Sequence, residues 1–213
     1  MQTHELIQAL AEDLRPVSPK RSAREVLFAL VFGATAALCI SVFVLGGQTD
    51  FGRAARGWSL WLKWIYTIPI CGSAFLAMQA LSRPAGSFSI HGRIALISVA
   101  VVAGMAASEL SHAPMWLWLS LGLGESWQRC PWRILFLSAP VFGALVWKIR
   151  RAAPTRLRLT GAAIGLTSGA CAATLYALGC AEQSAVFVMA WYSLGMILSG
   201  TVGALLGPIL LRW

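Results

Sequence analysis

Six long apolar stretches separated by short polar breaks dominate the hydrophobic pattern of the chain. The first runs from Val26 to Gly46, and about 21 residues at about 1.5 Å each are enough to cross the hydrocarbon core of a bilayer. This pattern predicts an all-α polytopic membrane protein with six transmembrane helices. The other five spans are expected at residues 59–81, 94–110, 131–148, 159–178 and 184–211.

The N-terminal segment before these spans has the pattern of an amphipathic helix rather than that of a membrane span. Over residues 3–14, apolar side chains recur at helical spacing on one face, and acidic or polar side chains lie opposite. An amphipathic helix on lipid needs a basic polar face, so docking onto a partner protein is favoured over lipid binding and over packing on the rest of the chain. We therefore divide the chain into a cytoplasmic docking helix with its linker (1–24) and a six-helix transmembrane domain (25–213). The apolar face consists of Leu6, Ile7, Leu10 and Leu14, and the acidic residues are Glu5, Glu12 and Asp13.

Composition agrees with this assignment. The chain of 213 residues is 58% hydrophobic and 12% charged, with a mean hydropathy of +0.70, which excludes an ordinary soluble domain. Its net charge of +9 does not require nucleic acid as a partner, because no soluble segment carries a basic stripe with interleaved aromatic residues. The basic residues instead lie between spans, as the positive-inside rule predicts for cytoplasmic loops.

The distribution of these charges predicts the orientation. With the N-terminus inside, 12 of the 17 basic residues lie at the inner ends of the spans, which indicates that both termini are cytoplasmic in a bacterial inner membrane. Lys63, near the outer start of the second span, is expected to snorkel toward the interface. The inner set is Arg15, Lys20, Arg21, Arg24, Arg83, Arg93, Lys148, Arg150, Arg151, Arg156, Arg158 and Arg212; the outer set is Arg53, Arg56, Lys63, Arg129 and Arg133.

Two further patterns predict local structure. Tryptophans are concentrated in the break between the third and fourth spans, so residues 115–119 are expected to form a short helix in the membrane interface. Small residues recur every four positions in the last two spans, a spacing that lets helices approach closely and favours a tight hairpin. The small residues are Gly161, Gly165 and Gly169 in the fifth span and Gly195, Ser199, Gly203 and Gly207 in the sixth.

Candidate chemistry lies at the outer ends of the spans. Cys39, Cys71 and Cys171 fall inside apolar runs and are expected to be buried, which leaves Cys130 and Cys180 as an accessible pair. In an oxidising compartment this pair could form a permanent structural disulfide or serve as a sensor. It could instead bind a soft metal ion transiently as thiolates, and no cofactor is obligatory. Further possible ligands are Glu109, His112 and Glu182, although the first two also fit an ordinary polar end to a helix.

No catalytic set is apparent, so we do not expect an enzyme. The sequence has no His-Glu-x-x-His motif, no phosphate-binding glycine-rich loop and no Cys-x-x-Cys pair. A small transporter or a membrane thiol-redox protein remains the competing interpretation.

Three motifs resemble the NrsF family of membrane-bound anti-sigma factors. They are Leu-Ile-x-x-Leu-Ala-x-Asp-Leu-x-Pro-Val at residues 6–17, Trp-x-x-Cys-Pro at 127–131, and Cys-x-Glu-x-x-x-x-Phe-x-x-x-Trp-Tyr at 180–192. The resemblance covers essentially the whole chain. It implies that the N-terminal segment holds a cytoplasmic sigma factor of the extracytoplasmic-function class inactive at the membrane, through Leu6, Ile7, Leu10, Asp13 and Leu14. It also implies that Cys130 and Cys180 take part in sensing heavy-metal or oxidative stress.

Overall fold

The computed structural model describes residues 19–43, 57–82, 89–152 and 154–212. These residues are helical apart from short connections, and no strand occurs among them. The predicted docking helix at 3–14 lies outside the described residues. The helices are α2 (Pro19–Phe43), α4 (Trp58–Leu81), α5 (Ser89–His112), the 3₁₀ turn η1 (Met115–Leu117), α6 (Trp118–Leu123), α7 (Cys130–Ile149), the 3₁₀ turn η2 (Arg150–Ala152), α8 (Leu157–Tyr176), α9 (Ala185–Phe187), the π-helical turn η3 (Val188–Tyr192) and α10 (Ser193–Leu210).

Six of the described helical segments are long and apolar enough to cross a membrane, which confirms the predicted all-α class and number of spans. The sixth is continuous through α9, η3 and α10. Large apolar side chains cover the outer surface of the bundle; Phe32 on α2 and Leu96 on α5, for example, are 72% and 71% exposed. Such a surface suits lipid rather than water as the solvent.

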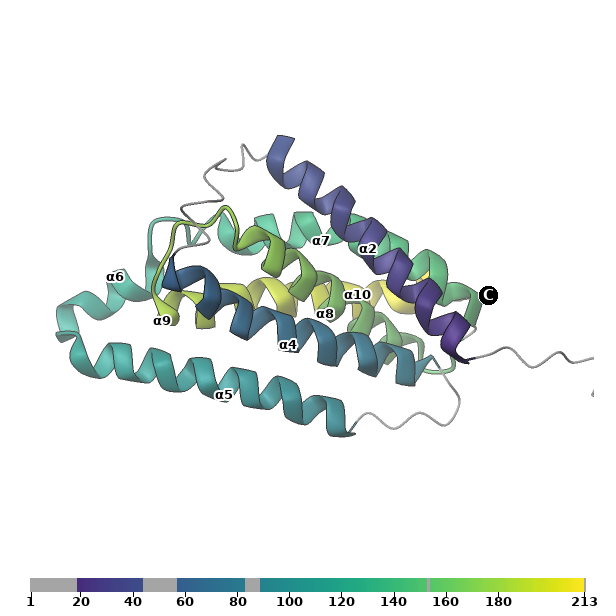
Figure 1. The fold of residues 1–213 in the computed structure, drawn as a ribbon, viewed down its shortest axis with the longest axis horizontal. Helices are drawn as coiled ribbons and strands as arrows, with labels where there is room; N and C mark the ends of the chain where they lie inside the picture. Colours follow the sequence, from purple (N-terminus) through teal and green to yellow (C-terminus); the bar gives the residue numbers. More distant parts are fainter. Residues whose placement is uncertain (1–18, 44–56, 83–88, 153, 213) are drawn as a thin grey trace, which may run out of the picture.

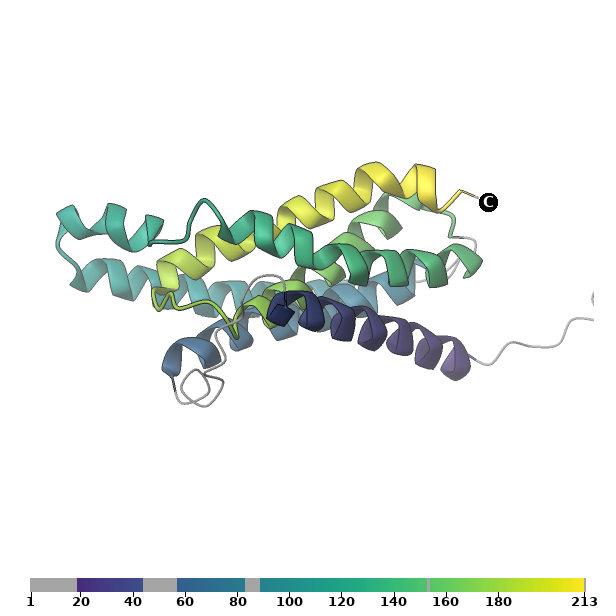
Figure 2. The same cartoon turned by 90° about the horizontal axis from the view of Figure 1, so that it is seen from above.

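The long helices lie side by side in an elongated bundle (Figures 1 and 2). The start of α2 and the end of α10 lie at one end, and the short helices α6 and α9 lie at the other. A helix is present at the predicted place, as η1 followed by α6, and it extends to Leu123 instead of ending at Leu119. Trp116 in it is 78% exposed, as expected for a side chain at an interface.

Helices α8 and α10 approach each other so closely that only small residues fit between them. A Cβ atom on Gly161 would lie 2.2 Å from the carbonyl oxygen of Gly203, and one on Gly165 would lie 2.2 Å from that of Ser199. The predicted tight hairpin of the last two spans is therefore confirmed. It fixes the position of the turn that carries Cys180.

Replacing Gly165 by Val is expected to lower the thermal unfolding midpoint, because the added side chain overlaps the α10 backbone. Overpacking of this kind costs about 1–3 kcal/mol. The midpoint can be measured on the protein purified in dodecyl maltoside. Gly143→Val is the matched control, since a Cβ atom at Gly143 meets nothing within 4 Å; equal losses in both variants would contradict the close packing.

Candidate functional site

The two outer cysteine segments meet at the end of the bundle that carries α6 and α9. One segment joins α6 to α7 and leads into Cys130, and the other joins α8 to α9 and contains Cys180. The positions of both segments are therefore set by α7 and α8, which are neighbouring helices of the bundle. Two carboxylates fasten these segments to their surroundings.

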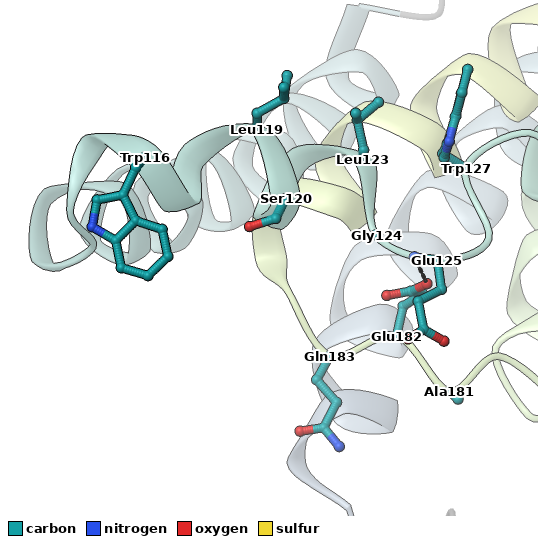
Figure 3. Close-up of a pocket in the computed structure, with 10 residues that line it drawn as sticks. All are labelled: Trp116, Leu119, Ser120, Leu123, Gly124, Glu125, Trp127, Ala181, Glu182 and Gln183. Carbon is teal, nitrogen blue, oxygen red and sulfur yellow. Dashed lines mark hydrogen bonds between the residues drawn. The ribbon is translucent and has the colours of Figure 1, made fainter.

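Glu182 ties the Cys180 segment to the residues that precede Cys130. Its Oε1 accepts hydrogen bonds from the Glu125 N–H at 2.8 Å, the Ser126 N–H at 3.0 Å and the Ser126 hydroxyl at 3.0 Å (Figure 3). Hydrogen bonds to an ionised acceptor are stronger than neutral ones. We call these three bonds the Glu182 latch.

Glu109 at the end of α5 fastens the other side of the Cys180 segment. Its Oε2 accepts hydrogen bonds from the Ala185 N–H at 2.7 Å, the Val186 N–H at 3.2 Å and the Ser184 hydroxyl at 3.1 Å. These N–H groups begin the sixth span, where a negative charge complements the helix dipole. Glu109 therefore caps the start of a helix that is distant from it in sequence.

His112 takes no part in either arrangement. Its imidazole Nδ1 lies 2.7 Å from the Ser108 carbonyl oxygen one turn earlier in α5, and the side chain is exposed. No hydrogen bond or ion pair between His112 and Glu109 occurs among the described residues. Cys180 and Glu182 lie within electrostatic range of Cys130, whereas His112 lies apart from them. No group of three or more His, Cys, Asp or Glu side chains that could hold a metal ion occurs in the described part of the chain.

The exposure of the cysteines differs from the expectation. Cys130 is fully buried and Cys180 is half-buried, whereas Cys39 is exposed on the bundle surface and Cys71 and Cys171 are half-buried. The prediction that Cys130 is accessible was wrong because its position in the first turn of α7 faces the core. All five thiols are free.

Lys63 lies beside the two outer cysteines, which the sequence did not indicate. It is fully buried, and its ammonium donates a hydrogen bond to the Cys180 carbonyl oxygen at 2.6 Å. It is also within electrostatic range of Cys130, Cys180 and Glu182. The snorkelling prediction was wrong because the side chain is buried and its ammonium binds the carbonyl oxygen of Cys180, 117 positions away in sequence. The buried charge adds a third tether to the Cys180 segment.

Aromatic side chains of the sixth span complete the site. Tyr192 in η3 is fully buried, and its hydroxyl lies close to Cys180. Trp191 packs on Trp127 with ring centroids 5.4 Å apart and donates from its indole N–H to the Gly122 carbonyl at 2.7 Å. A π-helical turn re-aims side chains, and such turns are frequent at functional sites.

Gly124 permits the tight contact between the two segments. Its φ of +56° lies in the left-handed region that favours glycine, and a Cβ atom there would lie 2.7 Å from Phe187 and 2.8 Å from Glu182. A glycine followed by two polar residues at 124–126 is a local signal for a turn, but it does not indicate that Glu182, which is distant in sequence, binds there.

Replacing Lys63 by Met is expected to speed alkylation of Cys180 several-fold, because the Cys180 carbonyl loses its buried donor and the segment loosens. The rate can be followed with a membrane-impermeant maleimide in a chain whose other four cysteines are replaced by Ala. Lys148→Met, at the opposite end of the bundle, is the control. An unchanged Cys180 rate in a folded Lys63→Met protein would contradict the tether.

Taken together, the fold and site define a six-span helical membrane protein with a buried lysine and two free thiols at one end. The sequence model of a family described as "Negative regulator of sigma F" (NrsF) matches residues 10–213. The chain belongs to this family.

Two relatives match along their full lengths. The chain is 38% identical over 218 residues to a protein of Caulobacter vibrioides (strain NA1000 / CB15N) named anti-sigma-F factor NrsF. It is 34% identical over 213 residues to a protein of Azospira oryzae (strain ATCC BAA-33 / DSM 13638 / PS) named probable anti-sigma-F factor NrsF. Each alignment covers 100% of both chains. No solved structure matches the chain significantly.

Proposed function

We propose that this protein holds a sigma factor of the extracytoplasmic-function class at the membrane and releases it when Cys130 and Cys180 respond to stress. The observation that carries the proposal is the full-length similarity to two proteins named as anti-sigma-F factors. The predicted amphipathic helix at residues 3–14 supplies the docking surface. In this proposal the protein regulates transcription and catalyses no reaction.

The orientation follows from the charges at the two ends of the bundle. Arg24, Lys148, Arg150 and Arg151 belong to the end at which α2 starts and α10 finishes. Cytoplasmic loops collect such residues, so we assign this end to the cytoplasm of a bacterial cell and the cysteines to the outer side of its inner membrane. The sigma factor and the stress signal then meet the protein on opposite sides.

The contacts around Cys180 support a route between the two sides. Its segment is held by Lys63 of α4, by Glu109 of α5 and by the residues preceding α7 through Glu182. Oxidation or metallation of the thiols would therefore alter three helix contacts at once. A switch from mostly bound to mostly free sigma factor requires a difference of about 5 kcal/mol between the two states.

Replacing Leu10 by Asp is expected to release the sigma factor without stress, because a charge would be buried in the docking interface. Loss of a central apolar contact weakens binding by at least about 2 kcal/mol, or roughly 30-fold. A reporter under the control of the sigma factor measures the release.

Gln8→Asp is the control for Leu10→Asp, because Gln8 lies on the polar face of the same predicted helix. Equal release by both variants would point to general damage to the segment. Continued repression by Leu10→Asp would sink the docking proposal. Transport activity in proteoliposomes without a sigma factor would favour the competing transporter interpretation.

Replacing Cys180 by Ser is expected to keep the sigma factor bound in unstressed cells and to abolish its release by cadmium or peroxide. A mass-shift thiol assay and sigma-factor retention can be followed in the same membranes. Cys39→Ser is the matched control, because this exposed thiol lies on α2, a helix that contributes no residue to the site. Retention that still responds to stress in Cys180→Ser would show that the sensor lies elsewhere, and a permanent Cys130–Cys180 disulfide would assign the pair a structural role.

A further inference from the structure

A cavity opens beside the Glu182 latch at the end of the bundle that carries α6. Its volume is about 750 Å³, within the range of small-molecule sites. It lies between α6 and the segment that follows Cys180 (Figure 3). The lining residues are Trp116, Leu119, Ser120, Leu123, Gly124, Glu125, Trp127, Ala181, Glu182 and Gln183.

The wall combines aromatic faces with carboxylates. Trp116 and Trp127 supply two indole rings, and Glu125 and Glu182 lie together at one corner of the cavity. Trp127 is held in place by its contact with Trp191. The cavity therefore has one fixed aromatic wall and, at Trp116, one exposed aromatic side chain at its edge.

Glu125 and Glu182 give this corner its negative charge; the buried Lys63 lies within electrostatic range of Glu182, but no ion pair between them occurs among the described residues. Neither Glu125 nor Glu182 forms a salt bridge with a basic side chain in the described part of the chain. The latch uses only Oε1 of Glu182, while Oε2 accepts no hydrogen bond from a described residue. The described residues that line the cavity include no lysine or arginine. A cation at this corner would meet the exposed Glu125 carboxylate and the Oε2 of Glu182 that the latch does not use, whereas an anion would approach two like charges.

From this combination we infer a binding site for an organic ammonium ion with an apolar body. Indole faces attract such cations through the ring quadrupole, and a carboxylate at the same site adds Coulomb attraction. The apolar body would lie against Leu119 and Leu123. A bare divalent ion fits less well, because no three potential ligands converge among the described residues.

The cavity adjoins the segment that carries Cys180, and binding of a cation there does not depend on the proposed anti-sigma function. Ala181 and Glu182 line the cavity directly after Cys180, so a bound cation stabilises the position in which the latch is closed. The ammonium group can come from a soluble molecule or from a phospholipid headgroup, since the tryptophans of this region are typical of a membrane interface.

The test measures binding of benzyltrimethylammonium to the full chain in dodecyl maltoside, a detergent with an uncharged headgroup, by isothermal titration calorimetry. Wild-type protein is expected to bind this cation and not benzenesulfonate, its anionic counterpart in size. Replacing Trp116 by Leu or Glu125 by Gln is expected to weaken binding by roughly 3- to 30-fold. Neither change alters the fold, because Trp116 is largely exposed and the Glu125 N–H that serves the latch is kept.

Trp58→Leu is the matched control, because Trp58 is also exposed but does not line the cavity. No binding above that of empty micelles, or equal binding by wild type and both variants, would overturn the inference. Loss with Trp116→Leu but not with Glu125→Gln would overturn the cationic assignment.

Two lipid additions to the same titration identify the source of the ligand. Weaker binding after addition of phosphatidylcholine, but not of phosphatidylglycerol, assigns the site to an ammonium headgroup. Unchanged binding with both lipids assigns it to a soluble cation. Because no sigma factor is present, failure here is distinguishable from failure of the proposed function.

Discussion

The backbone contact between α8 and α10 is the constraint on which the rest of the structure depends. In lipid, helices gain no hydrophobic energy from association, so close packing of small residues has to hold them together. Of the window of α8 that spans the membrane, 72% is buried, against 17–39% for the other five spans. Helices α4, α7 and α10 all pack on α8. Because Cys180 follows the end of α8, its position is determined by most of the bundle.

Polar contacts at the outer end use this rigid support. A buried ammonium is costly in an apolar environment unless it is hydrogen-bonded, and Lys63 meets that requirement with the Cys180 carbonyl. Glu109 and Glu182 are satisfied by backbone N–H groups of other segments. Each of these three side chains joins the Cys180 segment to a different part of the bundle. Thiol chemistry at this place would thus be coupled to the arrangement of the helices.

The opposite end of the bundle has a simpler arrangement. The start of α2 is tied to the end of α7 by an ion pair between Glu25 and Lys148. In the middle of these helices, Gly33 allows the α2 backbone to approach Val141, where a Cβ atom would lie 2.6 Å from the Val141 Cα. The first span, which follows the predicted docking helix, is therefore fixed to the same helix that begins with Cys130.

The number of spans, their approximate positions and the small-residue face of the last two helices were determined by the sequence alone, although α5 begins five residues before the predicted span. These features depend on local periodicity and on the fixed thickness of a bilayer, both of which can be read along the chain. The burial of Cys130, the inward direction of Lys63, the helix-capping role of Glu109 and the Glu182 latch were decided only by the tertiary structure. The hydrogen-bond partners of Lys63, Glu109 and Glu182 are between 56 and 117 positions away in sequence, and no local pattern specifies which distant backbone group will lie within hydrogen-bonding distance.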